Sequence, residues 1–434
     1  MQEAQRLAAL TVRRVLDGAT LPAALSAVAP PEREAAGRRR ALVQELAFGT
    51  LRYWGRLDAL VRVLAAKPFS DPALSCLVAV AIYQLDETRA PPFAVVDHAV
   101  NAAAVIARPA AKGLVNALLR RYLRERESLN AAVRCDPVAR WSYPAWWIRR
   151  VERDFPDAWE AILDAGNARP PLALRVNPRV GTRDALLAAY VHAGIGAVAA
   201  GAAGILVATP QPVADLPGFD EGAFSVQDLG AQLAAPLLRI EAGQRVLDAC
   251  AAPGGKTSHI AELADVDLLA LDSDETRLLR VRQNLDRLRL ASGRVRVEAG
   301  DAGEPSRWWD GIPFDRILAD VPCTASGVVR RHPDAKWLRR ETDIGQFVAQ
   351  QARLLDALWT CLARGGLLLY VTCSLFEAEN EAQIAAFAAR HSEALRESLT
   401  FAPELAHQGG QLLPSPPGAS HNQDGFFYAL IRKP

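Results

Sequence analysis

The spacing of apolar residues changes along the chain and divides its 434 residues into three regions. Within residues 1–135, apolar positions recur three and four apart in segments such as "RRRALVQELAFGTLRYW" and "KGLVNALLRRYLRER", which is the period of amphipathic helices. Residues 136–235 combine short apolar runs, "PLALRVNP" and "GILVATP", with the helical stretch "RDALLAAYVHAGI". We therefore predict an all-helical domain at 1–135, a small α/β connecting subdomain at 136–235 and a larger α/β domain at 236–434.

The third region has the alternation of a doubly wound α/β sheet. Five apolar runs read as strands, and helical stretches separate most of them: "QRVLDAC", "DLLALD", "RVRVEAGD", "FDRILADVPC" and "GGLLLYVTCS". In such sheets ligands bind beyond the carboxyl ends of the strands. The polar residues that end these strands are therefore the candidates for chemistry.

Composition narrows the class of protein. Half of the residues are apolar and 23% are charged, which is an ordinary globular balance. No signal peptide and no apolar run long enough to span a membrane is recognisable. The six cysteines form no CxxC pair and no cluster with zinc-ligand spacing, so we expect no metal site, no disulfides and a cytoplasmic location.

Basic residues are concentrated at the N-terminal end. Residues 1–130 hold 18 Lys and Arg against 12 Asp and Glu, although the whole chain has a net charge of only +1. The cluster Arg38, Arg39 and Arg40 and the arginines between 120 and 126 are either solvated helix faces or a surface that contacts phosphate. Likewise, Trp141, Tyr143, Trp146 and Trp147 either fill the core of a small unit or stack on bases.

The first strand of the third region is followed by "CAAPGGKT", residues 250–257. This segment is an incomplete phosphate-binding loop, because the G-x-x-x-x-G-K-[ST] motif needs glycine where Cys250 stands. A glycine-rich turn at this place also suits a nucleoside cofactor that the backbone approaches closely. Asp272 ends the second strand, 17 residues beyond Gly255, where an acid can reach ribose hydroxyls. Asp301 ends the third strand, where it can meet an adenine edge.

Two thiols follow the fourth and fifth strands. Cys323 lies in "ADVPC" and Cys373 in "YVTCS", and adjacent strands would bring both to one ligand-binding edge. A thiol beside a nucleoside cofactor suits methylation of a pyrimidine, because thiolate addition at carbon 6 makes carbon 5 nucleophilic. Asp320 could then hydrogen-bond the N3 and N4 edge of cytosine and stabilise the charge that addition creates.

These motifs resemble a known family. "DACAAPGGKT", "ADVPCTASGVVRRHPDAKW", "YVTCSLFEAENEAQI" and "DGFFYALIRK" are similar to the S-adenosylmethionine-dependent RNA cytosine-5 methyltransferases of the Sun/RsmB type. Residues 1–135 resemble the NusB-like RNA-binding domain that bacterial members carry. The resemblance implies a multidomain fold with an all-α NusB-like domain, a small α/β connecting subdomain and a Rossmann-like methyltransferase domain.

Roles for individual residues follow from the resemblance. It implies that Cys373 is the nucleophile, that Cys323 assists product release, and that Asp320 acts where methyl group and base meet. The S-adenosylmethionine site would comprise Cys250, Ala251, Ala252, Pro253, Gly254, Gly255, Lys256, Asp272, Asp301 and Asp320. The segment 224–238, "FSVQDLGAQLAAPLL", would complete the cofactor wall.

The chain departs from the family pattern at two places. The family more often has Ala where Val321 stands and a Pro-Glu-Glu-Asn run where this chain has "EAEN", 377–380; the second change could alter the loop that positions Cys373. After the first thiol, Arg330, Arg331, His332 and Lys336 are candidate contacts to RNA phosphate, although a solvated basic loop is the alternative.

Together these features predict a cytoplasmic, monomeric enzyme that methylates carbon 5 of a cytosine in 16S rRNA, with no metal and no membrane partner. The ribosomal substrate follows from the resemblance. A tRNA cytosine-5 methyltransferase would share the catalytic residues, and the NusB-like region favours rRNA. A non-catalytic RNA-binding or antitermination-type protein would use only the helical domain.

Overall fold

The computed structural model describes residues 1–28, 36–65, 67–69, 71–107, 109–209, 211–402, 405, 407–416, 418–419 and 421–434. They form two compact units. One comprises Met1–Asn167 together with Val329–Glu341, and the other comprises Ala168–Val328 and Thr342–Pro434. The helices of residues 137–167, predicted as part of the connecting subdomain, thus cluster with the N-terminal helices.

The first unit is helical, as its apolar period predicts. Its elements are α1 (Gln2–Leu16), α2 (Leu21–Val28), α3 (Ala36–Arg52), α4 (Trp54–Leu64), α5 (Pro72–Glu87), α6 (Pro92–Ile106), α7 (Ala111–Val133), α8 (Pro137–Trp141), α9 (Ala145–Asp154), α10 (Trp159–Asn167) and the short α15 (Ala335–Leu338). Asp71 caps α5 by accepting from the Ala73 amide at 2.9 Å, with Pro72 in the first turn. Helix α5 is apolar nearly all round and lies in the centre of the core.

The aromatic residues of 141–147 fill the core of this unit. Trp141, Tyr143 and Trp147 are buried, and Trp146 packs against Trp147 with ring centroids 5.2 Å apart. Of the two interpretations of this cluster, core packing is therefore the one the structure supports.

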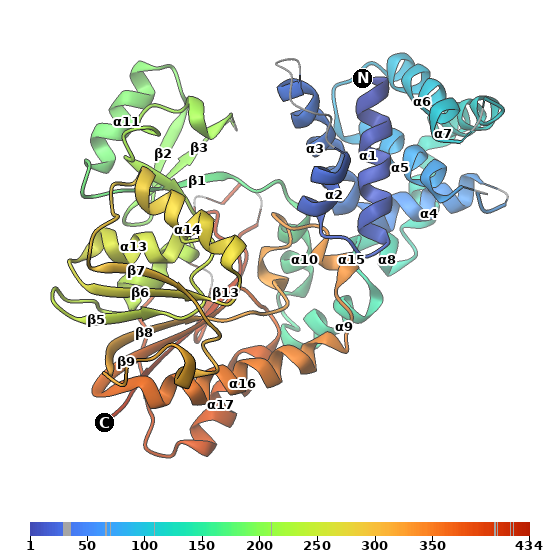
Figure 1. The fold of residues 1–434 in the computed structure, drawn as a ribbon. Helices are drawn as coiled ribbons and strands as arrows, with labels where there is room; N and C mark the ends of the chain where they lie inside the picture. Colours follow the sequence, from blue (N-terminus) through green and yellow to red (C-terminus); the bar gives the residue numbers. More distant parts are fainter. Residues whose placement is uncertain are drawn as a thin grey trace. The chain divides into compact units, whose positions relative to one another are not determined.

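The segment 329–341 is held in the helical unit by buried polar contacts, and Figure 1 draws α15 in orange among the blue and green helices. The Lys336 ammonium donates to Arg52 O at 2.7 Å, Ser142 O at 2.9 Å and Asn167 Oδ1 at 2.7 Å. It also lies 4.2 Å from the centre of the Tyr143 ring. The prediction that Lys336 contacts RNA phosphate is therefore wrong, because its donors are already used inside the core.

The second unit contains a small antiparallel sheet, β2 (Ala197–Ala200), β3 (Gly204–Val207), β1 (Leu172–Val176) and β4 (Phe224–Val226) in spatial order, with α11 (Arg183–His192). The fully buried Arg175 of β1 pairs with Glu262 of α13 (Gly255–Leu263) at 2.7 and 2.8 Å. Arg175 also donates to Gly255 O at 2.8 Å. The small sheet is thereby joined to the first turn of the helix that follows the glycine-rich segment.

The larger sheet has the order β11, β12, β13, β9, β8, β5, β6, β7. Its strands are β5 (Arg245–Asp248), β6 (Asp267–Asp272), β7 (Val295–Ala299), β8 (Phe314–Asp320), β9 (Leu362–Thr372), β11 (His407–Gln408), β12 (Gln411–Leu412) and β13 (Phe426–Arg432), and β10 (Leu395–Glu397) pairs with β13. The neighbouring strands β7, β6, β5, β8 and β9 are all parallel, whereas β13 runs antiparallel to β9. This confirms the predicted Rossmann-like sheet, with a mixed edge.

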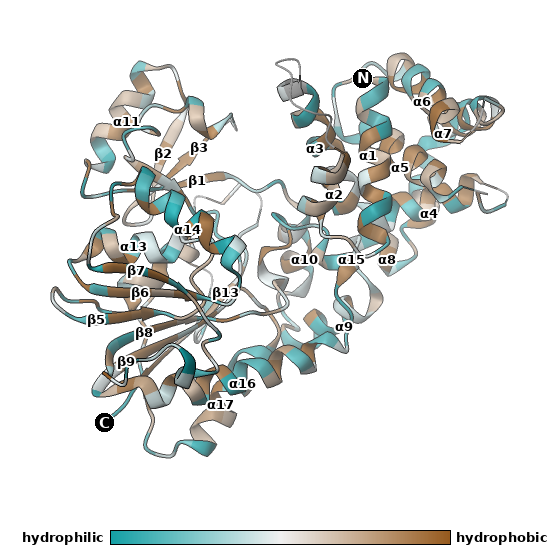
Figure 2. Ribbon diagram, viewed as in Figure 1, coloured by the Kyte–Doolittle hydropathy of each residue, from teal (hydrophilic) through white to brown (hydrophobic). Residues whose placement is uncertain are grey.

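Helices cover this sheet. They include α12 (Ala234–Leu237), α13, α14 (Glu275–Arg287), α16 (Asp343–Cys361) and α17 (Glu381–Arg390), and single 3-10 turns lie at 213–215, 231–233, 305–307, 326–328 and 377–379. Figure 2 shows the strands β6, β8 and β9 as mainly apolar, as expected for a sheet buried on both faces. Within the described residues, no helix is long and apolar enough to cross a membrane.

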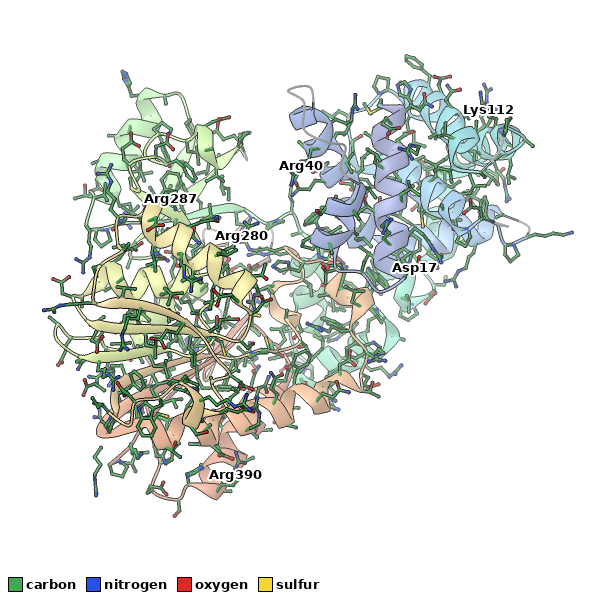
Figure 3. The ribbon with its side chains drawn as sticks, in the orientation of Figure 1. Asp17, Arg40, Lys112, Arg280, Arg287 and Arg390 are labelled. Atoms are coloured by element: carbon green, nitrogen blue, oxygen red, sulfur yellow. The ribbon has the colours of Figure 1, made fainter. Side chains whose placement is uncertain are left out.

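Lys336 provides a test of the contacts that hold residues 329–341. We expect Lys336→Met to lower the free energy of unfolding by about 3 kcal/mol, because two carbonyls and one amide oxygen lose their donor inside the core. Lys112→Met, at an exposed lysine of the same unit (Figure 3), should change it by less than about 0.5 kcal/mol. Chemical denaturation of both variants measures the difference, and equal stability would contradict the account.

Candidate active site

The turn after β5 brings the backbone close to neighbouring elements. Gly254 has φ of +99°, and a side chain there would approach the Val281 Cα of α14 to 3.0 Å. Both features require glycine. The turn leads into α13, and Thr257 in its first turn donates to Asp248 Oδ2 at 2.6 Å. The sequence thus folds here as the strand, turn and helix expected of a nucleoside-binding segment.

The two acids predicted to hold the nucleoside end consecutive strands. Asp272 is buried, and its oxygens accept from the amides of Ala252 and Asp274, each at 3.0 Å. Asp301 accepts from the Gly303 amide at 2.8 Å and from Arg353 at 2.9 Å. Partial burial raises the pKa of Asp301, but these two contacts outweigh it and hold that pKa below its ordinary value. Asp301 is thus an ionised acceptor with a basic neighbour, which the sequence did not indicate.

One pocket of about 230 Å³ is lined by most of the residues predicted to act in catalysis or to bind the cofactor. Its lining includes Cys250, Ala252, Asp272, Asp301, Asp320, Cys323 and Cys373. Ala251, Pro253, Gly254, Gly255 and Lys256 belong to the same turn but do not line this pocket. The two acids predicted to bind the cofactor and the two thiols therefore line one pocket at the carboxyl edge of the sheet.

The two thiols lie beside each other in this pocket. Cys323 Sγ and Cys373 Sγ are 3.3 Å apart, and Cys323 is buried while Cys373 is partly exposed. The hydrogen bond with Cys373, and after it burial, raise the pKa of the Cys323 thiol well above its ordinary value. Cys323 therefore keeps its proton at neutral pH and can donate it toward the Cys373 sulfur.

Asp320 has a partner that the sequence pattern did not reveal. The Lys256 ammonium lies 2.6 Å from Asp320 Oδ2. Burial opposes protonation of Lys256, but the contact with Asp320 outweighs it and raises the pKa of Lys256 above its ordinary value. Lys256 thus orients the Asp320 carboxylate and neutralises its charge.

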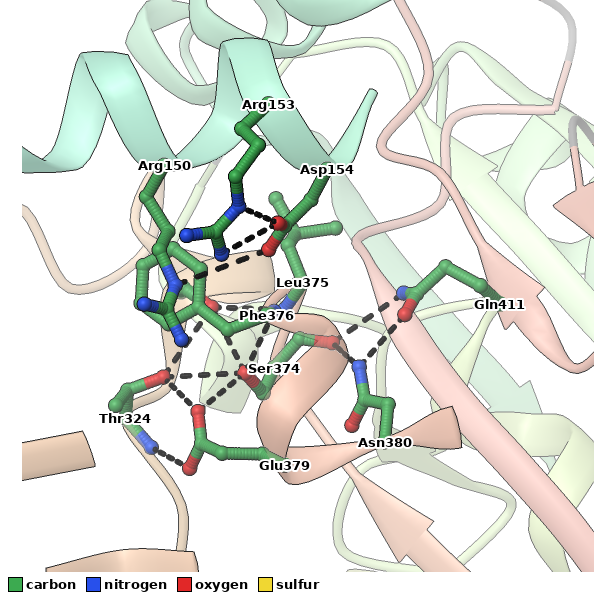
Figure 4. Close-up of polar contacts among 11 residues, drawn as sticks. Arg150, Arg153, Asp154, Thr324, Ser374, Leu375, Phe376, Glu379, Asn380 and Gln411 are labelled. Atoms are coloured by element: carbon green, nitrogen blue, oxygen red, sulfur yellow. Dashed lines mark hydrogen bonds and ion pairs between the residues drawn. The ribbon is translucent and has the colours of Figure 1, made fainter. Parts of the chain in front are cut away.

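Sequence reasoning also missed Glu379, in the acidic run 377–380. Its carboxylate lies among Thr324 and Ser374, the residues that follow the two cysteines (Figure 4). An acidic turn usually indicates a solvated surface. The one signal in the sequence that could have found Glu379 is its place in the run after Cys373 where the family has Pro-Glu-Glu-Asn.

The predicted RNA contacts have different environments. Arg39 and Arg40 are exposed on α3 (Figure 3 labels Arg40), whereas the side chain of Arg38 lies outside the described residues. His332 is exposed and Arg331 is half-buried. Arg330 is only 1% exposed, so the prediction that it contacts RNA is wrong, because its segment enters the helical core.

Comparison with protein families accounts for most of the chain. The family described as "16S rRNA methyltransferase RsmB/F" matches residues 235–432. A "Methyltr_RsmF/B-like, ferredoxin-like domain" matches residues 143–214, and the NusB family matches residues 2–124. The middle match crosses from the helical unit into the small antiparallel sheet.

Curated relatives match at full length. A ribosomal RNA small subunit methyltransferase B from Pseudomonas putida is 46% identical, over 99% of this chain and 97% of that protein. One from Serratia proteamaculans is 42% identical, over 98% of each.

Solved structures share the fold. A methyltransferase homologue from Pyrococcus horikoshii is 27% identical with a TM-score of 0.58, over 68% of this chain and 97% of that one. The structure of PH0851 has a TM-score of 0.81 over 100% of this chain and 99% of that one, at 24% identity.

The buried Asp248 beneath the glycine-rich turn predicts a pH effect. Burial raises its pKa from 3.8 to about 7, and its Oδ1 has no hydrogen-bond partner among the described residues. The folded state therefore holds this proton more tightly than the unfolded chain, so the contribution of Asp248 to stability is lost as pH rises from about 4 through 7.

We expect the melting temperature of Asp248→Asn to fall less between pH 5 and 8 than that of the natural chain. Asp286→Asn, at an exposed position of α14, should leave the natural pH profile unchanged. Thermal unfolding of the three proteins across this range makes the comparison. Parallel profiles for Asp248→Asn and the natural chain would show that the carboxyl is ionised throughout.

Proposed function

Because the chain belongs to the 16S rRNA methyltransferase RsmB/F family, we propose that it methylates carbon 5 of a cytosine in 16S rRNA, with S-adenosylmethionine as the methyl donor. The observation that carries this proposal is the 3.3 Å approach of Cys323 and Cys373 in a pocket that also holds Asp320 and the acids Asp272 and Asp301. An rRNA substrate agrees with the cytoplasmic location expected from the cysteines.

The hydrogen-bond acceptors of the pocket suit this cofactor. Asp272 uses one lone pair of each oxygen on a backbone amide, so the remaining lone pairs can accept from ribose hydroxyls. Asp301 lies at the next strand end, where it can meet the adenine. When bound, S-adenosylmethionine supplies an electrophilic methyl group at the side of the pocket where Asp320 and the thiols lie.

Cys373 is the proposed nucleophile. It is the more exposed of the two thiols, so a base can reach its sulfur. Once its proton has passed to solvent, the Cys373 thiolate adds to carbon 6, which forms an S–C bond and moves the electron pair of the 5,6 double bond toward carbon 5. Asp320, held by Lys256 at 2.6 Å, accepts a hydrogen bond from the cytosine edge and fixes the base during this step. Carbon 5 then has the electron density that methylation requires.

Cys323 acts in the second half of the reaction. After methylation, a water molecule takes the proton from carbon 5, and the electron pair of that C–H bond restores the double bond between carbons 5 and 6 as the bond between Cys373 and carbon 6 breaks. The Cys323 thiol keeps its proton because its pKa is raised, and it can donate to the departing Cys373 sulfur 3.3 Å away. This donation stabilises the leaving thiolate and so assists product release.

RNA is proposed to approach through basic residues that are exposed or half-buried. Arg39 and Arg40 of α3, Arg331 and His332 remain candidates for contacts with phosphate. The target cytosine must be unstacked or in a loop, since a thiol cannot reach carbon 6 within a stacked helix.

The division of labour between the thiols is testable by trapping the adduct. With unmodified 16S rRNA and S-adenosylmethionine, we expect Cys323→Ala to accumulate a protein–RNA band that survives a denaturing gel, because release is blocked while addition is not. Combining this change with Cys373→Ser should remove the band. Cys135→Ala, at an exposed cysteine outside the pocket, serves as the control and should give no adduct and normal turnover.

Two results would decide against the proposal. If Cys323→Ala turns over without forming a band, Cys323 has no part in release. If Cys373→Ser methylates RNA at the natural rate, Cys373 is not the nucleophile.

A further inference from the structure

The Glu379 carboxylate is fully buried and receives four hydrogen bonds. Its Oε1 accepts from the Thr324 amide at 2.9 Å and from Gln351 Nε2 at 3.1 Å. Its Oε2 accepts from the hydroxyls of Thr324 and Ser374, each at 2.5 Å. A buried carboxylate is costly unless several donors meet it, so this arrangement requires an explanation.

Three of the four hydrogen bonds come from the two loops that carry the thiols, and the fourth comes from helix α16. Thr324 directly follows Cys323, and Ser374 directly follows Cys373. Gln351 of α16 also donates to Pro322 O at 3.0 Å, on the other side of Cys323. One carboxylate thus contacts both loops within one residue of each sulfur, and Figure 4 shows it between Thr324 and Ser374.

Further hydrogen bonds hold the two loops together. Ser326 Oγ accepts from the Leu375 amide at 2.7 Å, and the Gly327 amide donates to Cys373 O at 2.8 Å. Asn380, next to Glu379, donates to Ser374 O at 2.9 Å. The first two bonds join the two loops and the third braces the Cys373 loop from within, but the Glu379 carboxylate receives more hydrogen bonds than any of these groups.

We propose that Glu379 is a positioning residue that sets the separation of the Cys323 and Cys373 sulfurs. Its significance for catalysis rests on the proposed function, whereas its effect on the spacing of the thiols does not. Glu379 does not line the pocket, so it acts through the two loops and not on the base. Without the carboxylate, four donors would lose their acceptor, and the loops would shift to satisfy them elsewhere.

The consequence for rate follows from the geometry that covalent catalysis needs. A displacement of about 1 Å at a reacting group lowers the rate by about 100-fold. We therefore expect Glu379→Ala to lower kcat by about this factor. The KM for S-adenosylmethionine should change less than about threefold, because Asp272 and Asp301 have other partners. Glu379→Gln should recover most of kcat, because its amide can donate to the two hydroxyls and its oxygen can accept from the two N–H groups.

A thiol-bridging reagent measures the spacing without any turnover. We would use a bifunctional bimane, which fluoresces strongly only after both of its arms have alkylated thiols, on the full-length protein. The natural chain and Glu379→Gln should bridge Cys323 and Cys373, and the signal should vanish in Cys323→Ser. Glu379→Ala should lose the fluorescence signal. The matched control is Glu381→Ala, because Glu381 is an exposed acid two residues after Glu379 and pairs with Arg396. This variant should keep both the signal and kcat.

Each outcome decides the proposal. Bridging and kcat at natural levels in Glu379→Ala would overturn it. If Glu379→Ala does not fold, Thr324→Val removes one of the four bonds at nearly constant volume. It should slow bridging and lower kcat by about threefold to tenfold, and natural values of both would also overturn the proposal. If the natural protein bridges its thiols but does not methylate 16S rRNA, the proposed function fails while the positioning role stands.

Discussion

The parallel pairing of β8 with β9 is the constraint on which the site depends. Asp320 at the end of β8 lies opposite Val371 of β9, and both strands run toward the same edge of the sheet. The chain therefore leaves the sheet twice at neighbouring points, once as the loop of Cys323 and once as the loop of Cys373. Because β5, β6 and β7 end at this edge too, the glycine-rich turn and the acids Asp272 and Asp301 reach the same pocket.

Sheet topology alone cannot fix two sulfurs 3.3 Å apart, because loops are free to vary. The structure limits this freedom with buried polar groups that each have several partners. Glu379 connects the two thiol loops, Lys256 holds Asp320, and Arg175 joins the small antiparallel sheet to α13. Each of these groups is costly to bury alone. Each therefore stabilises one arrangement of its neighbours strongly over the alternatives.

Much of the site could be predicted from the sequence because strand ends are visible in it. Apolar runs end in or just before Asp272, Asp301, Asp320, Cys323 and Cys373, and parallel strands bring such ends to one edge of the sheet. The confirmed predictions are the helical NusB-like region, the α/β subdomain and the Rossmann-like domain. All of them rest on periodicity over many residues or on long motifs.

The errors have a common physical cause. Lys336 and Arg330 lie in a short basic run, which local reasoning treats as a surface. The acceptors for Lys336 come from Arg52, Ser142 and Asn167, far away in the sequence. Glu379 is similar, since its donors belong to loops on two strands and a helix. The helices of 137–167 cluster with the N-terminal helices, where Tyr53 donates to Asn167 O and the Arg56 amide to Ser142 Oγ, and no local pattern specifies these contacts. A buried charged side chain cannot be recognised from the local sequence when its hydrogen-bond partners lie far away along the chain.

The most direct test of the account is to identify the methylated nucleoside. Unmodified, protein-free 16S rRNA and, separately, tRNA would be incubated with the protein and S-adenosylmethionine labelled in its methyl group, then digested and separated by chromatography. The account predicts label in 5-methylcytidine from 16S rRNA and none from tRNA. Label confined to tRNA, or found in a nucleoside other than 5-methylcytidine, would contradict it.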